Sequence, residues 1–273
     1  MRTLAWNYRG VGRAPTVKGL KELIHESNPK IVFQSETKSK SPRINKIKSR
    51  LNFANYYYVE PIGRAGGLAL FWRLRVELEV MYFDKNMITA FVYSGPPNSP
   101  WLLFAIYRPC RRNKRTIFWE MLENMVLSFS RPWIVIGDLN CIKRADEKRG
   151  GRSILESSIN CLRDFMANTG AIDLSFNEPS FTWSNWRAGL VNIKECLDQC
   201  LCDQEWKILF LKAGVKYLSN ANSDQNPILL DTHLEPKNLN HPFRFEAMWT
   251  KDERSRVVVK NAWQAEMEGS HGF

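Results

Sequence analysis

The chain has 273 residues, of which 44% are hydrophobic, and it includes 10 Trp and 15 Phe. This composition excludes a disordered chain, and the length allows one large hydrophobic core or two small ones. The formal net charge of +11 favours a polyanionic partner, nucleic acid above all, because the basic residues occur in clusters. The alternative is that a basic surface only keeps the chain in solution.

The cysteines and the N-terminus indicate an intracellular chain without a membrane span. The six cysteines form no Cys-x-x-Cys pair, which is typical of free thiols in a reducing compartment. Cys196, Cys200 and Cys202 could be zinc ligands, but they alternate in an apolar run with no nearby His, so a buried strand is favoured. The N-terminus lacks the apolar core of a signal peptide, and no run approaches membrane-spanning length.

The first elements alternate between strand and helix. Residues 3–6 predict a short strand that ends at Asn7, and apolar residues at helical spacing follow Pro15. A second buried strand at 30–33 is followed closely by Glu36. Polar side chains therefore appear twice just beyond a strand end.

The stretch 38–50 has six basic residues and no acidic one, and Tyr56, Tyr57 and Tyr58 come soon after it. Basic side chains beside aromatic ones suit a phosphate backbone with bases to stack on. An equally good interpretation is a solvated helix that buries Ile44, Ile47 and Leu51 and leads into an ordinary strand.

Four further strands are predicted at 67–72, 76–82, 88–93 and 101–107, with Tyr107 at the end of the last. Because no helix fits between them, we expect antiparallel hairpins. A second basic cluster at 108–115 and a helix at 116–129 follow.

The unbroken apolar run 133–136 predicts a strand buried on both faces. It ends at Gly137, and Asp138 and Asn140 then point to the same side of the extended chain. A carboxylate and an amide at such a strand end can hold a cation, orient a water or bind a phosphate. Taken alone, the same residues could form a simple turn.

The rest of the chain repeats this pattern. A helix at 154–168 ends at Gly170, and strands are predicted at 180–185, 196–202 and 227–230. Asp198 lies in the second of these strands, where a charge needs a partner, and Asp224 and Gln225 precede the third. We expect one domain at 1–235, followed at 236–273 by a linker and a truncated helical tail.

As an ordered set, these segments resemble the endonuclease/exonuclease/phosphatase superfamily, whose fold is DNase-I-like and related to that of AP endonucleases. Segments such as Leu-Ala-Trp-Asn-Tyr-Arg-Gly, Ser-Glu-Thr-Lys, Gly-Asp-Leu-Asn and Phe-Arg-Phe-Glu-Ala-Met-Trp are similar to the endonuclease domain of plant LINE-type (non-LTR) retrotransposons. The resemblance covers nearly the whole chain. It implies a four-layer α/β/β/α sandwich of two mixed sheets flanked by helices.

The resemblance also implies Mg²⁺- or Mn²⁺-dependent hydrolysis of DNA phosphodiesters in the nucleus. In this interpretation Glu36 and Asn7 hold the metal with Asp224 close by, Asp138 orients or deprotonates the attacking water, and Asn140 and Tyr107 grip the phosphate. The expected DNA-contacting residues are Arg9, Lys38, Arg111, Arg112, Trp183 and Asn185. No obligate protein partner is indicated. The reverse transcriptase domain of such elements is missing, so we expect a fragment or a decayed copy.

The main departure from the family is Gln225, which stands where the last motif, Ser-Asp-His, has a His paired with the aspartate that Asp198 represents. A Gln side chain donates a hydrogen bond but carries no charge and transfers no proton. Loss of such a group costs roughly 10²- to 10⁴-fold in rate. Cys196 and Gln199 also replace basic residues usual in plant relatives, whereas Tyr8, in place of a usual Cys, should be harmless.

Two main functions remain open. One is an endonuclease weakened by Gln225, and the other is a catalytically dead remnant that binds nucleic acid. A third, a phosphatase for small phosphates or inositol lipids, is disfavoured by the LINE-like segments.

Overall fold

The computed structural model describes residues 1–8, 10, 14–63, 65–109, 115–152, 156–174, 181–218, 223–234, 257 and 260. The chain divides into two compact units, Met1–Leu234 and Glu235–Phe273. The elements below all belong to the first unit. The predicted tail at 236–273 lies almost entirely outside the described residues, so its helical nature stays a prediction.

The first sheet is mixed and has six strands among the described residues. β1 and β2 are parallel, and the other neighbours are antiparallel. The strand order is β14 (Gly214–Tyr217), β15 (Ile228–Asp231), β1 (Arg2–Asn7), β2 (Ile31–Ser35), β4 (Leu68–Trp72) and β3 (Asn55–Val59). Its central strands are apolar on both faces, as expected for strands covered on both sides.

The second sheet is also mixed, with β7 and β8 as its parallel pair. The strand order within the described residues is β10 (Ile172–Asp173), β13 (Asp198–Cys202), β8 (Trp133–Asp138), β7 (Trp101–Tyr107), β6 (Met87–Val92) and β5 (Leu78–Phe83). A three-stranded sheet joins β11 (Trp183–Ser184), β12 (Lys194–Glu195) and β9 (Lys148–Arg149). Short 3₁₀ turns at Ala145–Glu147 and Gly189–Val191 precede β9 and β12.

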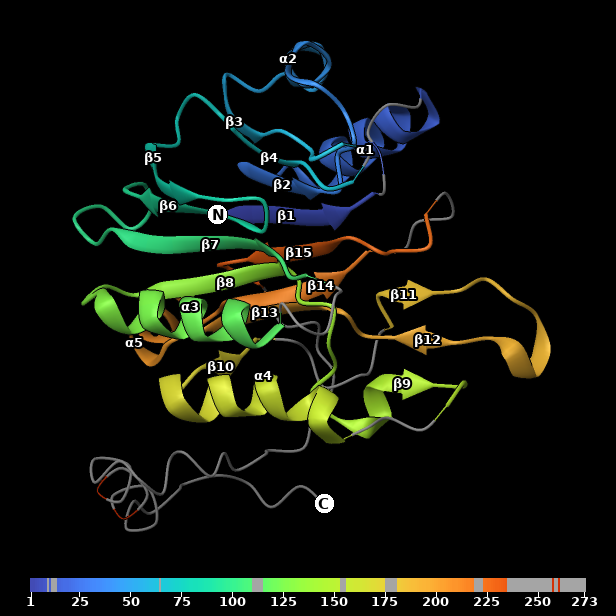
Figure 1. The fold of residues 1–273 in the computed structure, drawn as a ribbon. Helices are drawn as coiled ribbons and strands as arrows, with labels where there is room; N and C mark the ends of the chain where they lie inside the picture. The colour runs from blue at the N-terminus through green and yellow to red at the C-terminus, as the bar shows by residue number, and fades with distance from the viewer. Residues whose placement is uncertain are drawn as a thin grey trace, which may run out of the picture. The chain divides into compact units, whose positions relative to one another are not determined.

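Helices cover the outer face of each sheet, and Figure 1 shows the resulting layers. α1 (Ala14–Ser27) and α2 (Ser41–Arg50) bury Leu20, Ile44 and Ile47 against the first sheet. α3 (Arg115–Ser128) and α4 (Glu156–Thr169) pack on the second sheet, and a third core fills the space between the sheets. The predicted α/β/β/α sandwich of two mixed sheets is therefore confirmed.

The structure adds elements that the sequence did not indicate. β14 and α5 (Gln204–Leu209) were not predicted, and α5 begins with Asp203 accepting a hydrogen bond from the backbone N–H of Trp206 at 2.9 Å. The expected hairpin between β4 and β5 does not form, because these two strands belong to different sheets. The strand expected at 180–185 is reduced to β11. None of the described helices has both the length and the apolar character needed to cross a membrane.

Candidate active site

The first sheet brings Asn7 and Glu36 together. Asn7, the last residue of β1, lies opposite Ser35 in the parallel pair with β2, and its side chain is buried. Glu36 follows immediately, in a left-handed backbone conformation at φ 51°. The carboxylate and the amide predicted at separate strand ends are therefore neighbours at one edge of this sheet.

The second sheet places Tyr107, Asp138 and Asp198 at one edge in the same way. Tyr107 is the register partner of Asp138 in the parallel pair β7–β8. Asp198 is the register partner of Asp138 on the other side, in the antiparallel pair β8–β13. Asp138 thus lies between the other two residues.

Two hydrogen bonds connect the edges of the two sheets. Asn7 Nδ2 donates to Asp138 Oδ2 at 2.8 Å, and the Tyr107 hydroxyl donates to Glu36 Oε1 at 2.5 Å. Each bond runs from one sheet to the other. Two of the predicted metal residues, Asn7 and Glu36, therefore lie in one cluster with Tyr107 and Asp138.

The segment before β15 completes the cluster. Gln225 Nε2 donates to Asp138 Oδ2 at 3.1 Å, and the indole N–H of Trp6 donates to the Gln225 carbonyl at 2.9 Å. The indole N–H of Trp183 donates to Asp224 Oδ2 at 3.2 Å. Trp183 also forms a β-bridge with Gln225, so β11 lies beside this segment.

Asp138 is the centre of the polar network and is 1% exposed. Burial raises the pKa of its carboxyl, and Glu36 adds to the rise, while Asn7, the backbone N–H of Asn140 and Gln225 oppose it by donating hydrogen bonds. A carboxylate with a raised pKa accepts a proton more readily than an ordinary aspartate. Three hydrogen bonds therefore hold the Asp138 carboxylate in place, and the carboxylate can chemically accept a proton.

Among the described residues, Asp198 has no ion pair with a cationic side chain, although a buried charge would need a partner. It is 2% exposed, and its Oδ2 has no hydrogen-bond partner in the described part of the chain. Burial and then the neighbouring Asp138 hold the pKa of its carboxyl well above the ordinary value, although Thr182 opposes the rise. A proton on Asp198 removes the cost of a buried charge.

A tight turn carries Asn140 back towards Asp138. The backbone N–H of Asn140 donates to Asp138 Oδ1 at 2.9 Å, and Asn140 has φ 46°. Gly137 precedes the turn at φ 137°, and a Cβ there would lie 2.1 Å from the Ile106 carbonyl oxygen. The segment therefore does form a turn, and this turn places the Asn140 backbone N–H against the Asp138 carboxylate.

The oxygen donors at Glu36 fit a hard cation that keeps most of its water. Glu36 Oε2 is buried and has no hydrogen-bond partner among the described residues, although Lys38 Nζ forms an ion pair with it at 3.2 Å. No described group of three or more His, Cys, Asp or Glu side chains could hold a metal. Mg²⁺ needs few protein carboxylates and retains several waters, so this sparse donor set suits it.

Three of the residues expected to contact DNA form hydrogen bonds or ion pairs within the chain. Lys38 pairs with Glu36, and Trp183 is bonded to Asp224. Asn185 bonds the backbone of its own hairpin, through Nδ2 to Val191 O at 2.8 Å and by accepting from Ile193 N at 3.0 Å. The DNA contacts of these three residues stay predictions. Arg9, Arg111 and Arg112 lie outside the described residues.

Sequence reasoning missed two supporting residues. Thr182 is buried, and its hydroxyl accepts hydrogen bonds from the backbone N–H groups of Leu197 and Asp198 at 2.9 and 3.1 Å. Arg108, which the sequence placed in a basic cluster, is 1% exposed. Only its position directly after Tyr107 could have indicated a role at the site.

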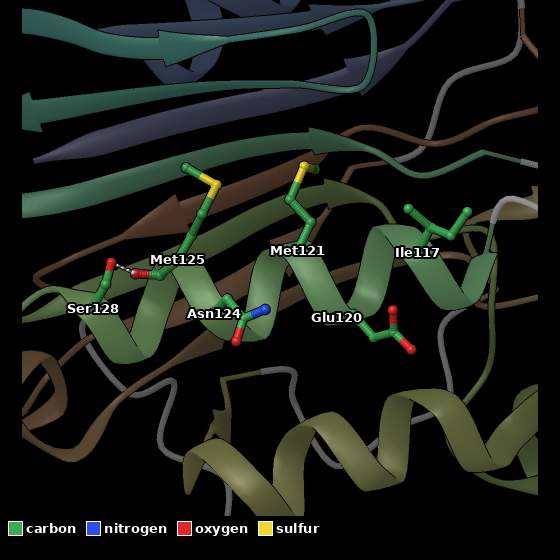
Figure 2. A pocket seen from close by; sticks show the side chains of 6 residues that line it. All are labelled: Ile117, Glu120, Met121, Asn124, Met125 and Ser128. Atoms are coloured by element: carbon green, nitrogen blue, oxygen red, sulfur yellow. Dashed lines mark hydrogen bonds between the residues drawn. The ribbon is translucent and has the colours of Figure 1, made fainter.

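Two surface hollows differ in their relation to the cluster. One of about 440 Å³ includes Trp183 and Asp224 in its lining, together with Phe181, Trp186, Lys194 and Tyr217. The other, of about 550 Å³, lies along α3 and shares no residue with the cluster. Figure 2 shows the six side chains that line it, among them Ile117, Met121 and Met125.

Residues 4–220 match the family model described as the Endonuclease/Exonuclease/phosphatase family. No curated protein matches the chain.

The fold is similar to those of solved nucleases at low sequence identity. An AP endonuclease from Leishmania major is 14% identical, with a TM-score of 0.67 over 84% of this chain and 86% of that chain. An AP endonuclease from Archaeoglobus fulgidus is 13% identical, with a TM-score of 0.66 over 85% of this chain and 98% of that one. The endonuclease domain of TRAS1, a telomere-specific non-LTR retrotransposon, is 12% identical, with a TM-score of 0.61 over 86% and 99%.

Proposed function

The chain belongs to the endonuclease/exonuclease/phosphatase family, and on this basis we propose that it is a metal-dependent phosphodiester hydrolase that acts on DNA. The observation that carries the proposal is the buried carboxylate of Asp138, which accepts hydrogen bonds from Asn7, Gln225 and the Asn140 backbone. The Glu36–Tyr107 pair lies at the same edge. This arrangement supports hydrolysis because the Asp138 carboxylate can accept a proton and the Glu36 carboxylate can serve as a metal ligand.

We assign the following roles to these residues, and Tyr107 also orients the Glu36 carboxylate through its hydroxyl. Asp138 orients a water and takes its proton as the water oxygen attacks phosphorus, and the phosphodiester P–O bond breaks to release the leaving oxygen as an alkoxide, which takes a proton from solvent. Asn140 and Tyr107 bind the phosphate oxygens, and Asp198 supports Asp138 from the neighbouring strand. Glu36 and Asn7, with Asp224 nearby, would hold Mg²⁺ or Mn²⁺. Such an ion supplies positive charge that stabilises the developing charge on the phosphate.

Gln225 weakens this hydrolase. Its amide N–H donates to Asp138 Oδ2, and its Oε1 is buried with no hydrogen-bond partner in the described residues. An imidazolium at this place would add a positive charge and a transferable proton, which the amide lacks. We therefore expect the rate to be roughly 10²- to 10⁴-fold below that of the same chain with a histidine there.

The second candidate function is a catalytically inactive protein that binds nucleic acid. The basic residues of α2 favour it, because Arg43, Lys46 and Arg50 are exposed whereas Ile44 and Ile47 face the core. Such a surface attracts a phosphate backbone whether or not hydrolysis survives.

We also propose a plant LINE-type retrotransposon as the origin, on the strength of segments such as Gly-Gly-Leu-Ala-Leu-Phe-Trp, and nuclear action on that basis. A reverse transcriptase reading frame downstream in the genomic locus would support the origin, and an unrelated downstream sequence would contradict it. A fluorescent fusion that stays outside the nucleus would contradict the location.

Plasmid nicking in Mg²⁺ tests the main proposal. We expect slow nicking by the wild type, faster nicking by Gln225→His, and none by Glu36→Gln. Gln204→His is the matched control, because Gln204 is an exposed residue at the start of α5 and should leave the rate unchanged.

The other outcomes separate the alternatives. If the wild type nicks as fast as Gln225→His, the argument about the missing imidazole is wrong. If neither nicks but both bind duplex DNA, the binding function replaces the hydrolase. An abasic duplex and a phosphoinositide head group as parallel substrates test the phosphatase interpretation.

A further inference from the structure

Arg108 is among the largest fully buried side chains of the described residues. It directly follows Tyr107 at the end of β7, so it leaves the strand beside the candidate site. A buried guanidinium is costly unless its N–H groups find acceptors. The acceptors for its guanidinium N–H groups must therefore be sought among the residues of the candidate site.

Arg108 contacts the turn that carries Asp138 and Asn140 through both its side chain and its backbone. Its Nε donates to the Leu139 carbonyl, and its Nη2 donates to the Asn140 carbonyl. Its own backbone N–H donates to the Asp138 carbonyl at 2.9 Å, and its carbonyl accepts from Asn140 Nδ2 at 2.9 Å. The side chain and backbone of one residue thus contact each residue of the turn.

Because the peptide unit is planar, the Arg108 contact with the Leu139 carbonyl also fixes the orientation of the Asn140 N–H. The Leu139 carbonyl and the Asn140 N–H belong to the same planar peptide unit and point in opposite directions. When Arg108 holds the carbonyl, the N–H is aimed the other way, and it donates to Asp138 Oδ1 at 2.9 Å. The Asn140 backbone has φ 46°, in the left-handed region that Asn tolerates better than most residues, and the Arg108 contacts to the Leu139 and Asn140 carbonyls fix that conformation.

We infer that Arg108 is a positioning residue that holds the Asp138–Asn140 turn in the conformation that presents the Asp138 carboxylate and the Asn140 amide to the phosphodiester. This inference rests on the proposed hydrolase, because Arg108 acts through those two residues. Its planar fork reaches two carbonyls at once, which the single ammonium of a lysine cannot reproduce. The competing interpretation is a general contribution to folding.

Hydrogen exchange separates positioning from general stability. In Arg108→Met, which keeps most of the side-chain volume and removes the donors, we expect the Asn140 amide to exchange ~10-fold faster or more, because its peptide unit is released. Ile134, the second residue of β8, is paired with a strand on each side, and its amide is the reference that should keep its rate. If both amides accelerate by the same factor, the residue serves only folding and the inference is wrong.

Kinetics provide the second measurement, made in the wild type and in Gln225→His to raise the signal. We expect kcat for nicking to fall roughly 10²-fold in Arg108→Met, because misplacement of reacting groups by about 1 Å has an effect of that size. Arg108→Lys should recover only a small part of it. In Arg108→Ala, added guanidinium ion should restore kcat, whereas ammonium ion should not.

The two measurements can fail independently. If neither background nicks DNA, the proposed hydrolase fails, and the exchange ratio of Asn140 to Ile134 still decides whether Arg108 positions the turn. If nicking is present but Arg108→Met and Arg108→Lys retain full kcat, the inference about Arg108 is overturned while the hydrolase stands.

Discussion

Asp138 and Asp198 are register partners in the antiparallel pair β8–β13, and their side chains are buried, at 1% and 2% exposure. Hydrogen-bond donors surround the Asp138 carboxylate, whereas Asp198 Oδ2 has no hydrogen-bond partner within the described residues. Two carboxyl groups so placed cannot both ionise cheaply. The donors therefore favour charge on Asp138 and a proton on Asp198.

The first prediction concerns the pH dependence of stability. The pKa of Asp198 is raised in the folded chain, above all by burial. The folded chain binds the Asp198 proton more tightly than the unfolded chain does. The stability that this proton contributes is therefore complete below the unfolded pKa of about 3.9 and is lost as pH rises through the folded pKa. Asp198→Asn removes this loss, so the variant should be more stable than the wild type at pH 8 by ~1–3 kcal/mol and not at pH 3.5.

Urea unfolding at the two pH values measures the difference. Asp146→Asn is the control, because that carboxylate is exposed and its removal should change stability by less than ~0.5 kcal/mol at either pH. Equal stability of Asp198→Asn and the wild type at pH 8 would show that Asp198 finds a partner.

The second prediction concerns Gly137 at the end of β8. An added Cβ would meet the Ile106 carbonyl oxygen at 2.1 Å, and the backbone there has φ 137°. Gly137→Ala should lower the free energy of unfolding by about 3 kcal/mol or more, since overpacking and backbone strain add. Gly170→Ala, at φ 69° with nothing within 4 Å, should cost only about 1–2 kcal/mol. Equal losses in the two variants would refute the close approach of β7 and β8.

The third prediction concerns a buried ion cluster near the site. Lys143 Nζ lies 3.3 Å from Glu147 Oε1 and also pairs with Asp173, and the Lys143 and Glu147 side chains are only 10% and 4% exposed. Lys143→Met leaves two carboxylates without this cation, so chemical denaturation should show a loss of ~3–5 kcal/mol. The adjacent Arg144→Met breaks an exposed pair and should cost at most ~1 kcal/mol. A small loss for Lys143→Met would mean that the carboxylates are satisfied in another way.

The fourth prediction concerns Tyr107, whose hydroxyl donates to Glu36 Oε1. Tyr107→Phe should weaken Mg²⁺-dependent nicking roughly 10- to 100-fold and raise the Mg²⁺ concentration for half-maximal activity, because a residue that orients a metal-binding carboxylate has an effect of this size. Tyr82→Phe removes a hydroxyl on the exposed strand β5 and serves as control. An unchanged Mg²⁺ dependence in Tyr107→Phe would separate this hydroxyl from metal binding.

Local patterns in the chain were enough to predict most of the elements. Apolar runs predicted the buried strands β1, β2 and β8, and helical spacing of apolar residues predicted α1, because burial on one or both faces imposes these periods. The same patterns failed for β4 and β5, since periodicity does not tell which strands become neighbours. They also gave no sign that Arg108, placed in a basic cluster, is buried.

Each polar side chain at a predicted strand end could be identified from the sequence, so the chain alone supplied the candidates Asn7, Glu36, Tyr107 and Asp138. Which of them meet depended on the packing of one sheet against the other. The bonds Asn7–Asp138 and Tyr107–Glu36 join residues 131 and 71 positions apart. Burial between the two sheets strengthens these bonds and raises the pKa of Asp198, and no local sequence pattern carries information about that burial.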